Sequence, residues 1–414
     1  MNDLLRQAES WQGLSNMTYE WLATQYGTAW YHAHVHSTAW EGVFGRIIIN
    51  GPASQNYDED LGKLLISDWT HYTAQETYPV VEQNGPQGIA NGLLNGKNIW
   101  YDGQNKGACP LNGSIPAGGC FFKRDPTPLP DMVGERYKAI VERGKSYRIR
   151  LVNTALNDNC EFLVEGHSIT VIAIDLVPIK PYVPATNSVK IYMANATGDG
   201  PFWINATVLT GCSWIHNIGT IQGILYYGND TDEIPVNQEL PGSVPRDNSC
   251  FDEPLGHVFH NCSAQINQNF YEIPEGQEWA YMLINNTVTG KASVEHHIHL
   301  HDHDFYILAQ GMGQLEQSMI NLENPARRDT ALLLGHAGYL LIAWKANSPG
   351  LWLMHCHLAF HSAMVFDLQI LERREEFNRT ANLTECNRVC YELASPPGAW
   401  DHWNQRQSEA FAGV

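Results

Sequence analysis

The stretch LMHCHLAFH, residues 353–361, places a cysteine between two histidines and adds a third histidine four residues later. In a β-strand the side chains alternate between two faces, so His355 and His357 would point to one face and Cys356 to the other. After the strand the chain can turn back, which would bring His361 to the cysteine side. This one strand can therefore contribute ligands to two separate metal sites.

Two other segments supply histidines in a similar spacing. In EHHIHLHDHDF, residues 295–305, His299 and His301 are two residues apart, and His296 lies three residues earlier, where it could turn toward the cysteine. In WYHAHVH, residues 30–36, His32 and His34 form a third pair. The three segments hold eleven of the 18 histidines in the chain, a grouping too dense for unrelated core or surface histidines.

The ligand types favour copper. A thiolate with two imidazoles is the ligand set of blue-copper electron-transfer sites, because these donors together select copper over magnesium or calcium. The candidates for such a site are His296, Cys356 and His361. A dinuclear zinc hydrolase is the first rival, but HHIHLHDH does not match its H-x-H-x-D-H order, and such an enzyme needs no thiolate in that setting. A non-enzymatic copper-binding or storage protein is the second rival.

Short strand-like runs recur along the chain. They are rich in Ile, Val, Leu and Tyr and are separated by Gly, Pro and Asn turns, as in GRIIING (45–51), SYRIRLVNT (146–154), HSITVIAIDLVPI (167–179), GTIQGILYYG (219–228), EWAYMLINN (278–286) and YLLIAWKA (339–346). This pattern predicts an all-β protein. Polar stretches near 50–60 and 237–249 favour boundaries that give units at 1–55, 56–240 and 250–375, followed by a helix-capable acidic tail at 376–414.

Composition limits the partners. The chain has 414 residues, of which 43% are hydrophobic and 17% charged, so it can bury two or three domain cores. Its formal net charge of −19 repels nucleic acid and anionic lipid but tolerates neutral or cationic small molecules. No uninterrupted apolar run is long enough to span a bilayer. We therefore expect no nucleic acid and no membrane as partners.

The chain also carries marks of the secretory route. It has nine cysteines, and Asn-x-Ser/Thr glycosylation sequons are dense. The N-terminal residues contain no apolar signal segment, so we expect that the beginning of a secreted protein is missing. The sequons are at Asn16, Asn112, Asn195, Asn205, Asn229, Asn261, Asn285, Asn378 and Asn382.

Taken with these features, five stretches resemble one family. They are TYEWLATQYGTAWYHAH (18–34), INGPASQNYDEDLG (49–62), TVIAIDLVPI (170–179), NPARRDT (324–330) and HCHLAFH (355–361). The chain resembles multicopper oxidases of the laccase type, in particular ascomycete laccases and related phenol-coupling oxidases. This resemblance implies tandem cupredoxin-like Greek-key β-sandwiches, three in the family and about two and a half here. It also implies copper at type 1, type 2 and type 3 sites, four ions in the full-length family.

The resemblance assigns the ligands. It implies a type 1 site of His296, Cys356 and His361, a type 2 ligand at His299, a type 3 copper held by His34, His301 and His355, and its partner held by His32 and His357. The implied partners are a small phenolic substrate and O2, with the protein acting as a secreted, extracellular monomer. The implied reaction takes single electrons from the phenol and uses four of them to reduce O2 to water.

Two further positions bear on tuning and substrate. The family's axial position falls on Phe366, a side chain that cannot coordinate, which favours a comparatively high copper potential. Asp175 matches a laccase carboxylate that accepts the phenol's proton, although a solvated Asp at a strand end is the alternative.

We expect Met364 to pack in the core. The family's usual Pro is replaced by His297, which we expect to lie next to a ligand without binding the metal, or on the surface. The usual Gly is replaced by Asp302, which we expect in a turn. We expect the extra histidine His36 to lie outside the ligand set as well.

Some expected parts do not occur in the sequence. Laccases carry an earlier His-x-His pair, whereas here no histidine precedes His32. We therefore expect a truncated chain that cannot close the three-copper cluster and fails to reduce O2; an inactive copper-binding isoform, a ferroxidase and an ascorbate-oxidase-like enzyme are the alternatives.

The resemblance implies a Cys212–Cys250 bridge and a first-domain partner for Cys390. A local pair of Cys109 with Cys120 is plausible, and Cys160, Cys262 and Cys386 stay unassigned.

Overall fold

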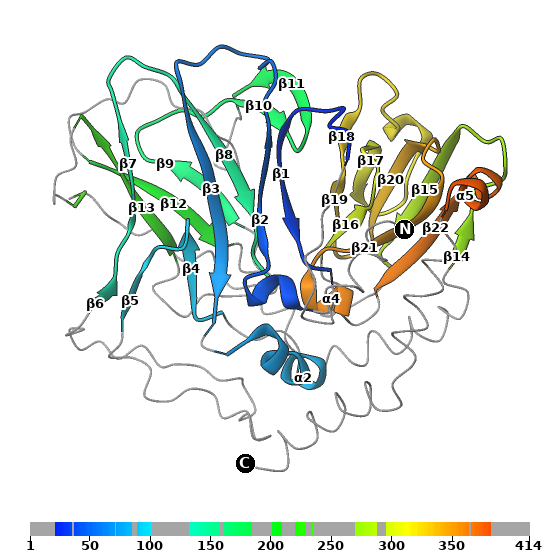
Figure 1. Cartoon of the computed structure of the whole chain (residues 1–414), viewed down its shortest axis with the longest axis horizontal. Helices are drawn as coiled ribbons and strands as arrows, with labels where there is room; N and C mark the ends of the chain where they lie inside the picture. Colours follow the sequence, from blue (N-terminus) through cyan, green and yellow to red (C-terminus); the bar gives the residue numbers. More distant parts are fainter. Residues whose placement is uncertain are drawn as a thin grey trace.

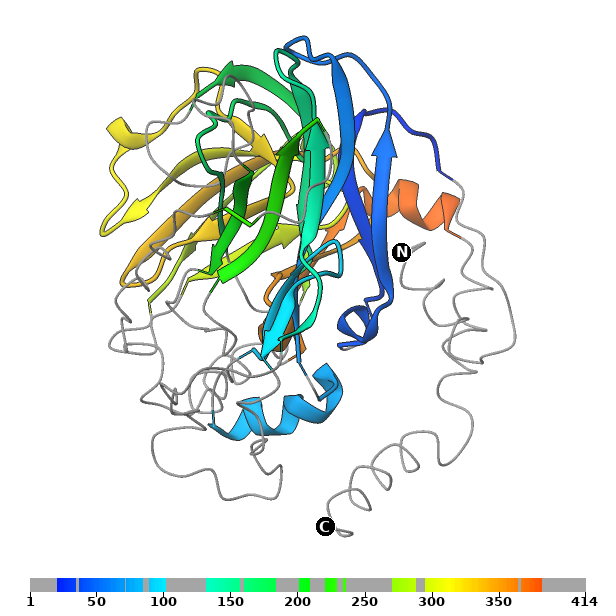
Figure 2. The ribbon, with the colours of Figure 1, turned by 90° about the vertical axis from the view of Figure 1, so that its left-hand side faces the viewer.

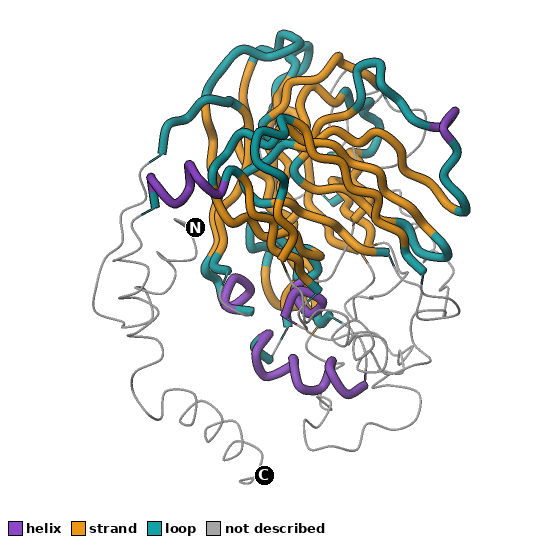
Figure 3. The backbone as a smooth tube through the Cα atoms, turned by 90° about the vertical axis from the view of Figure 1, so that its right-hand side faces the viewer, coloured by secondary structure: helices purple, strands orange, loops and turns teal. Residues whose placement is uncertain are grey.

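The computed structural model describes residues 21–34, 37–70, 72–84, 89–101, 132–156, 160–183, 201–208, 220–228, 234–235, 270–287, 295–363 and 366–381. Within these residues β-strands dominate, and the predicted all-β class is confirmed. Strands form the body of the molecule in Figure 3, and the few helical segments lie at its margins. The expected bridges of Cys109, Cys120, Cys212, Cys250 and Cys390, and the side chains of His36 and Met364, lie outside the described residues.

The first unit is an antiparallel ribbon. Strand β1 (Gly27–His32) pairs with β2 (Phe44–Ile49), from Gly27 opposite Ile49 to His32 opposite Phe44. A short 3₁₀ helix, η2 (Thr38–Glu41), lies between the two strands. The ribbon stands between two larger sandwiches (Figure 1), so the end of β1 can reach side chains of the last one.

The middle sandwich packs a three-stranded sheet on a four-stranded sheet. The first has the order β4 (Asn91–Leu94), β3 (Glu59–Trp69), β8 (Tyr147–Asn153), and the second has the order β7 (Tyr137–Val141), β13 (Thr220–Tyr227), β12 (Phe202–Val208), β9 (Cys160–Val164). Every residue of β12 is buried, as expected for a central strand covered on both faces. Leu64, Leu94, Ile204 and Leu225 lie in the shared core.

Smaller elements surround this sandwich. Two-stranded ribbons are formed by β5 (Ile99–Tyr101) with β6 (Met132–Gly134) and by β10 (Val171–Ile174) with β11 (Val177–Tyr182). Helix α2 (Ala74–Asn84) lies below the strand ends in Figure 2. The run HSITVIAIDLVPI is therefore not one strand, because Asp175 adopts a left-handed φ of 55° and turns the chain between β10 and β11.

The last sandwich carries most of the candidate ligands. Its five-stranded sheet has the order β14 (Phe270–Glu272), β22 (Asp367–Glu372), β21 (Gly350–Cys356), β16 (His296–Leu300), β19 (Thr330–Leu333). Its four-stranded sheet has the order β15 (Trp279–Asn285), β20 (Gly338–Lys345), β17 (Phe305–Met312), β18 (Ala326–Arg328). Leu300, Leu340, Ile342 and the fully buried Trp344 fill the space between the sheets.

Three short helical segments complete this unit. They are η6 (Gln317–Met319), α4 (Ala359–Ala363) and α5 (Arg374–Thr380). Helix α4 follows β21 directly and packs Ala359 and Phe360 into the core of the middle sandwich, while the Ala359 N–H donates to the Leu156 carbonyl at 3.2 Å. Helix α5 overlaps the start of the helix-capable tail expected at 376–414. None of the described helices is long and apolar enough to cross a membrane.

Candidate metal centre

Two neighbouring strands place the candidate ligands. Strand β16 pairs with β21 so that Ile298 lies opposite Cys356 and His299 lies opposite His355. Because side chains alternate along each strand, Cys356 points to the core side with Ile298, whereas His299 and His355 share the other face. The expected division of the HCH stretch between two sites is therefore present in the backbone register.

The first group lies on the core side of these strands. The Cys356 Sγ is 3.7 Å from Nδ1 of His296 and 3.5 Å from Nδ1 of His361, and the two Nδ1 atoms are 3.2 Å apart. All three residues are buried. His361 reaches the group because the chain turns into α4, and the Phe366 N–H then donates to the His361 carbonyl at 3.2 Å. Three ligand atoms thus converge in a site closed to water.

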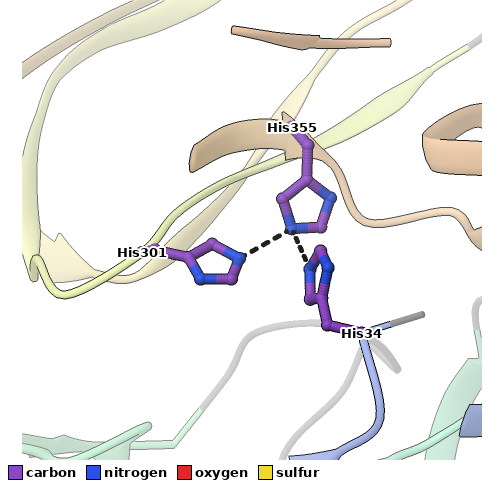
Figure 4. A group of neighbouring side chains, drawn as sticks. All are labelled: His34, His301 and His355. Carbon is purple, nitrogen blue, oxygen red and sulfur yellow. Dashed lines mark hydrogen bonds between the residues drawn. The ribbon is translucent and has the colours of Figure 1, made fainter. Parts of the chain in front are cut away.

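The second group joins distant parts of the chain (Figure 4). The Nε2 atom of His355 is 3.2 Å from Nε2 of His34 and 3.2 Å from Nε2 of His301. His34 follows β1, His301 follows β16, and His355 lies on β21. Among the described residues, this group and the first one are the sets of three possible ligands whose donor atoms all lie within 4.8 Å of one another.

The other three predicted histidines lie beside this group. The ring of His357 is 5.2 Å from that of His32 and 5.4 Å from that of His299, centre to centre. The Nδ1 of His299 lies 2.8 Å from the carbonyl of Asp329, so Nδ1–H donates and Nε2 is left for a metal. The ring of Trp30 lies 4.4 Å from that of His32 and so packs against the cluster.

Burial keeps these imidazoles neutral. It is the main cause that lowers the pKa of His34 and of His296 to about 4, with neighbouring histidine charge as a smaller cause. Burial also lowers the pKa of His301, His355 and His357 well below the ordinary value. A neutral imidazole offers the lone pair that a metal ion needs. At neutral pH the cluster is therefore ready to bind a cation.

Burial has the opposite effect on the pKa of the Cys356 thiol. Complete burial raises this pKa to about 12, and hydrogen bonds with the backbone of Leu358 and His297 lower it by a smaller amount. Without a metal the group is therefore a thiol at neutral pH. Binding of a soft metal ion at this site releases the proton, because the thiolate is the form that coordinates.

Asp175 lies at the β10–β11 turn. Its carboxylate accepts a hydrogen bond from Nε of Arg328 at 3.2 Å, and its side chain is 25% exposed. The pKa of Asp175 is raised, first by burial and second by the charge of Asp329, while Arg328 opposes both. The carboxylate is thus paired with a cation and only partly solvated, which differs from a freely solvated strand-end Asp.

The remaining positions have simple surroundings. The Phe366 ring lies 4.9 Å from the His296 ring, edge to face, and brings no donor atom to the first group. Asp302 has a left-handed φ of 65° in the turn after β16, as the turn interpretation predicts. His297 belongs to neither group of three; burial and the charge of Arg328 lower its pKa to about 4.

Comparison with known proteins identifies the family. Family models described as multicopper oxidase match residues 9–54, 60–229 and 233–376. Oxidoreductase OpS5 of Beauveria bassiana (strain ARSEF 2860) is 34% identical over 427 residues, covering 88% of this chain and 68% of that protein. The chain belongs to the multicopper oxidase family. This multicopper oxidase is also 31% identical over 418 residues to Laccase-2 of Botryotinia fuckeliana, covering 86% of the chain and 67% of that protein.

A solved structure supports the same conclusion. The laccase of Botrytis aclada superposes with a TM-score of 0.72 at 26% identity, covering 92% of this chain and 76% of that one. The expected cupredoxin-like fold of this multicopper oxidase is confirmed, and its cofactor is copper. The residues present fit that metal, since a buried sulfur and imidazole nitrogens form groups of three whose ligand atoms all lie within 4.8 Å of one another.

Sequence reasoning missed one residue beside the cluster and a buried polar contact elsewhere in the last sandwich. Asp329, which orients His299, was quoted only as part of a family stretch. A buried carboxylate at Glu372 accepts from the Trp344 indole N–H at 2.8 Å and lies 3.1 Å from Nε2 of His303. The positions of Glu372 and Trp344 on separate strands gave no signal in the sequence, because their contact depends on how the two sheets stack.

Proposed function

We propose that this copper-dependent oxidoreductase is a laccase-type enzyme, one that takes single electrons from phenolic donors and delivers four of them to O2, which becomes water. That these 414 residues by themselves fail at the O2 step stays a prediction. Relatives named laccase, at about a third identity over most of the chain, support this reaction. The donor set supports it as well, because bound copper supplies one-electron chemistry that no protein side chain here provides.

The buried group of His296, Cys356 and His361 is the proposed type 1 site, where the substrate electron enters. Phe366, the residue that matches the family's axial position, lies beside the His296 ring and would bring no donor atom to a bound copper ion. Absence of an axial thioether favours a high potential, which suits oxidation of phenols.

The observation that carries the proposal is the register of β21. Cys356 lies between His355 and His357 in the chain, and these two histidines belong to the second cluster on the opposite face. An electron that enters at the Cys356 sulfur thus has a short covalent path to the place where O2 would bind. The proposed ligands there are His299 for type 2, His34, His301 and His355 for one type 3 copper, and His32 and His357 for the other.

Asp175 is the proposed proton acceptor for the phenol. A phenol that loses an electron becomes strongly acidic, so a carboxylate within reach of its hydroxyl assists the transfer. Nε of Arg328 donates to Oδ2, and the backbone N–H of Asp329 also donates to this carboxylate. A carboxylate has about four lone-pair sites, so it can accept a further hydrogen bond from the phenol hydroxyl. A raised pKa, caused first by burial, makes this carboxylate a better base than an exposed one.

We also propose that the enzyme is a secreted monomer that acts on small phenols. The exposed sequons Asn285 on β15 and Asn378 on α5 are accessible to glycosylation. Asn205 differs, because it is buried on β12 and accepts a hydrogen bond from Gln222 at 3.2 Å, so this sequon is a structural asparagine.

The test uses single-turnover spectroscopy. Without O2, a phenol should bleach the blue absorption of the copper-loaded chain, and Cys356→Ser should show neither colour nor phenol oxidation. Cys160→Ser, which changes a buried cysteine of the middle sandwich, is the matched control and should behave like the wild type. A blue chain that ferrous iron reduces but phenols do not would assign a ferroxidase instead. A colourless wild type would exclude the whole proposal.

A further inference from the structure

The start of β1 is a junction of three parts of the molecule. The Gln25 amide donates to Oδ2 of Asp304 in the last sandwich. The Thr28 N–H donates to the carbonyl of Asp175 on the β10–β11 turn at 3.4 Å, and the Arg150 guanidinium of the middle sandwich donates to the Thr28 hydroxyl at 2.8 Å. These contacts fix the strand just ahead of the histidine pair that it carries.

The β10–β11 turn lies directly against this strand. Gly27 has a φ of 148°, and a Cβ atom there would lie 2.8 Å from the Asp175 carbonyl oxygen and 3.0 Å from Cα of Leu176. Both values are shorter than ordinary van der Waals contact, so only glycine allows the backbones to approach this closely. Asp175 is therefore a contact residue of β1 as well as a candidate proton acceptor.

Two consecutive arginines bind the same junction. At the end of β18, Arg327 donates through a terminal guanidinium N–H to Oδ2 of Asp304 at 3.1 Å, and Arg328 donates through Nε to Oδ2 of Asp175 at 3.2 Å. Asp304 thus binds both Gln25 and Arg327. Arg328 thus connects the last sandwich to the β10–β11 turn, and Arg327 binds the Asp304 carboxylate that accepts from Gln25 ahead of β1.

The next residue contacts the cluster itself. The Asp329 carbonyl accepts hydrogen bonds from Nδ1 of His299 at 2.8 Å and from the Leu300 N–H at 3.1 Å. The Thr330 hydroxyl donates to the Asp329 carboxylate at 3.0 Å and holds this residue in place. A carbonyl that accepts from one imidazole nitrogen fixes the ring and directs the other nitrogen to the metal.

We propose that Arg327, Arg328 and Asp329 form a clamp that holds the strand bearing His32 and His34 at the distance from the last sandwich that copper binding at the second cluster requires. This clamp explains the Arg-Arg-Asp core of the NPARRDT stretch. The proposal rests on the proposed function, since it takes His34, His301 and His355 as copper ligands. The type 1 group is independent of the clamp, because all of its ligands belong to the last sandwich.

We expect the clamp to affect the position of β1 more than the free energy of unfolding. The side chains of Arg328 and Asp175 are 38% and 25% exposed, and those of Arg327 and Asp304 are 36% and 17% exposed. Ion pairs with such access to water contribute little to the free energy of unfolding. Removing one arginine should therefore leave a folded chain whose β1 strand is less firmly placed.

The experiment measures copper at each group separately. In a Cys356→Ser/His296→Gln background, which removes two of the three ligands of the first group, calorimetric titration with Cu²⁺ reports the His34, His301 and His355 group. In the chain that keeps both residues, the blue absorption reports the type 1 group. Adding Arg328→Met should lower the Cu²⁺ affinity of the second group by about 10- to 100-fold, the usual effect of losing an outer-sphere contact. The blue absorption should not change.

Controls separate the clamp from general effects. Arg374→Met removes an ion pair with Glu272 in the same sandwich but outside the junction. This pair is at least as exposed as the Arg328–Asp175 pair, and its loss should change the copper affinity of neither group. Arg328→Lys should retain part of the affinity. If the clamp works through Asp175, then Asp175→Asn combined with Arg328→Met should cost no more affinity than the larger single effect.

Each other result is decisive. Equal Cu²⁺ affinity in Arg328→Met and the parent chain would overturn the clamp and leave the proposed function standing. Equal loss of blue absorption and of the second group would also overturn it, since it would mean a general loss of fold. No Cu²⁺ binding at the second group in the parent chain would overturn the ligand assignment, and the clamp with it.

Discussion

The copper-free chain should lose stability as the pH falls, because its buried histidines must stay neutral to remain folded. Burial lowers the pKa of His34 and His296 to about 4, whereas an unfolded histidine titrates at 6.5. Between these values the unfolded chain binds protons that the folded chain does not. The stability that depends on these neutral histidines is therefore complete above 6.5, the pKa of an unfolded histidine, and is lost as the pH falls toward about 4.

The size of the loss follows from the two pKa values. Going from about pH 7.5 to about pH 5, one such histidine costs roughly 2 kcal/mol of unfolding free energy, since each pKa unit corresponds to about 1.4 kcal/mol. His34 and His296 together then account for about 4 kcal/mol, a large share of the stability of an ordinary domain. The other buried ligands add to this loss in the same direction.

Urea unfolding of the copper-free chain at the two pH values measures this loss. His296→Gln replaces the imidazole by a neutral side chain and should reduce the pH-dependent loss by about 2 kcal/mol. His336→Asn changes an exposed histidine in the turn between β19 and β20 and should leave the loss unchanged. The same pH-dependent loss in His296→Gln as in the wild type would show that this imidazole is not buried in neutral form.

Three further predictions concern tuning, base and core. Asp175→Asn should slow oxidation of phenols strongly and leave a non-phenolic one-electron donor nearly unchanged; equal losses in steady-state rates would refute a role as base. Phe366→Met should lower the midpoint potential of type 1 copper in a redox titration, and an unchanged potential would show that position 366 is not axial. Trp344→Phe should lower the free energy of unfolding by about 1.5–3 kcal/mol in denaturant titrations, because Glu372 loses a buried hydrogen bond; a loss below about 0.5 kcal/mol would count against that bond.

The all-β class and the alternation of the HCH stretch between two faces were predictable because they depend on local patterns. A period of two assigns His355 and Cys356 to opposite faces without any knowledge of distant contacts. The run from His167 to Ile179 shows the limit of such patterns, since its strand propensity is continuous and yet Asp175 turns the chain. That turn accepts a hydrogen bond from the Thr28 N–H of β1, which lies far away in the sequence.

The surroundings of the cluster could not be predicted for the same reason. Arg328 and Asp175 are 153 residues apart, and His34 and His355 are 321 residues apart, so neither contact leaves a local periodicity. Only the resemblance to a family linked the His32 and His34 pair to the last sandwich. Which strand packs on which sheet decides these contacts, and that is a property of the whole fold.

The absorption spectrum of the copper-loaded chain tests the central claim most directly. A buried Cys356 thiolate with His296 and His361 should give an intense blue charge-transfer band with copper, and the band should be absent in Cys356→Ser and unchanged in Cys160→Ser. Loading should also release a proton from the thiol, which a pH indicator can follow. An intense blue band in Cys356→Ser, or no band in the wild type after full loading, would contradict the account.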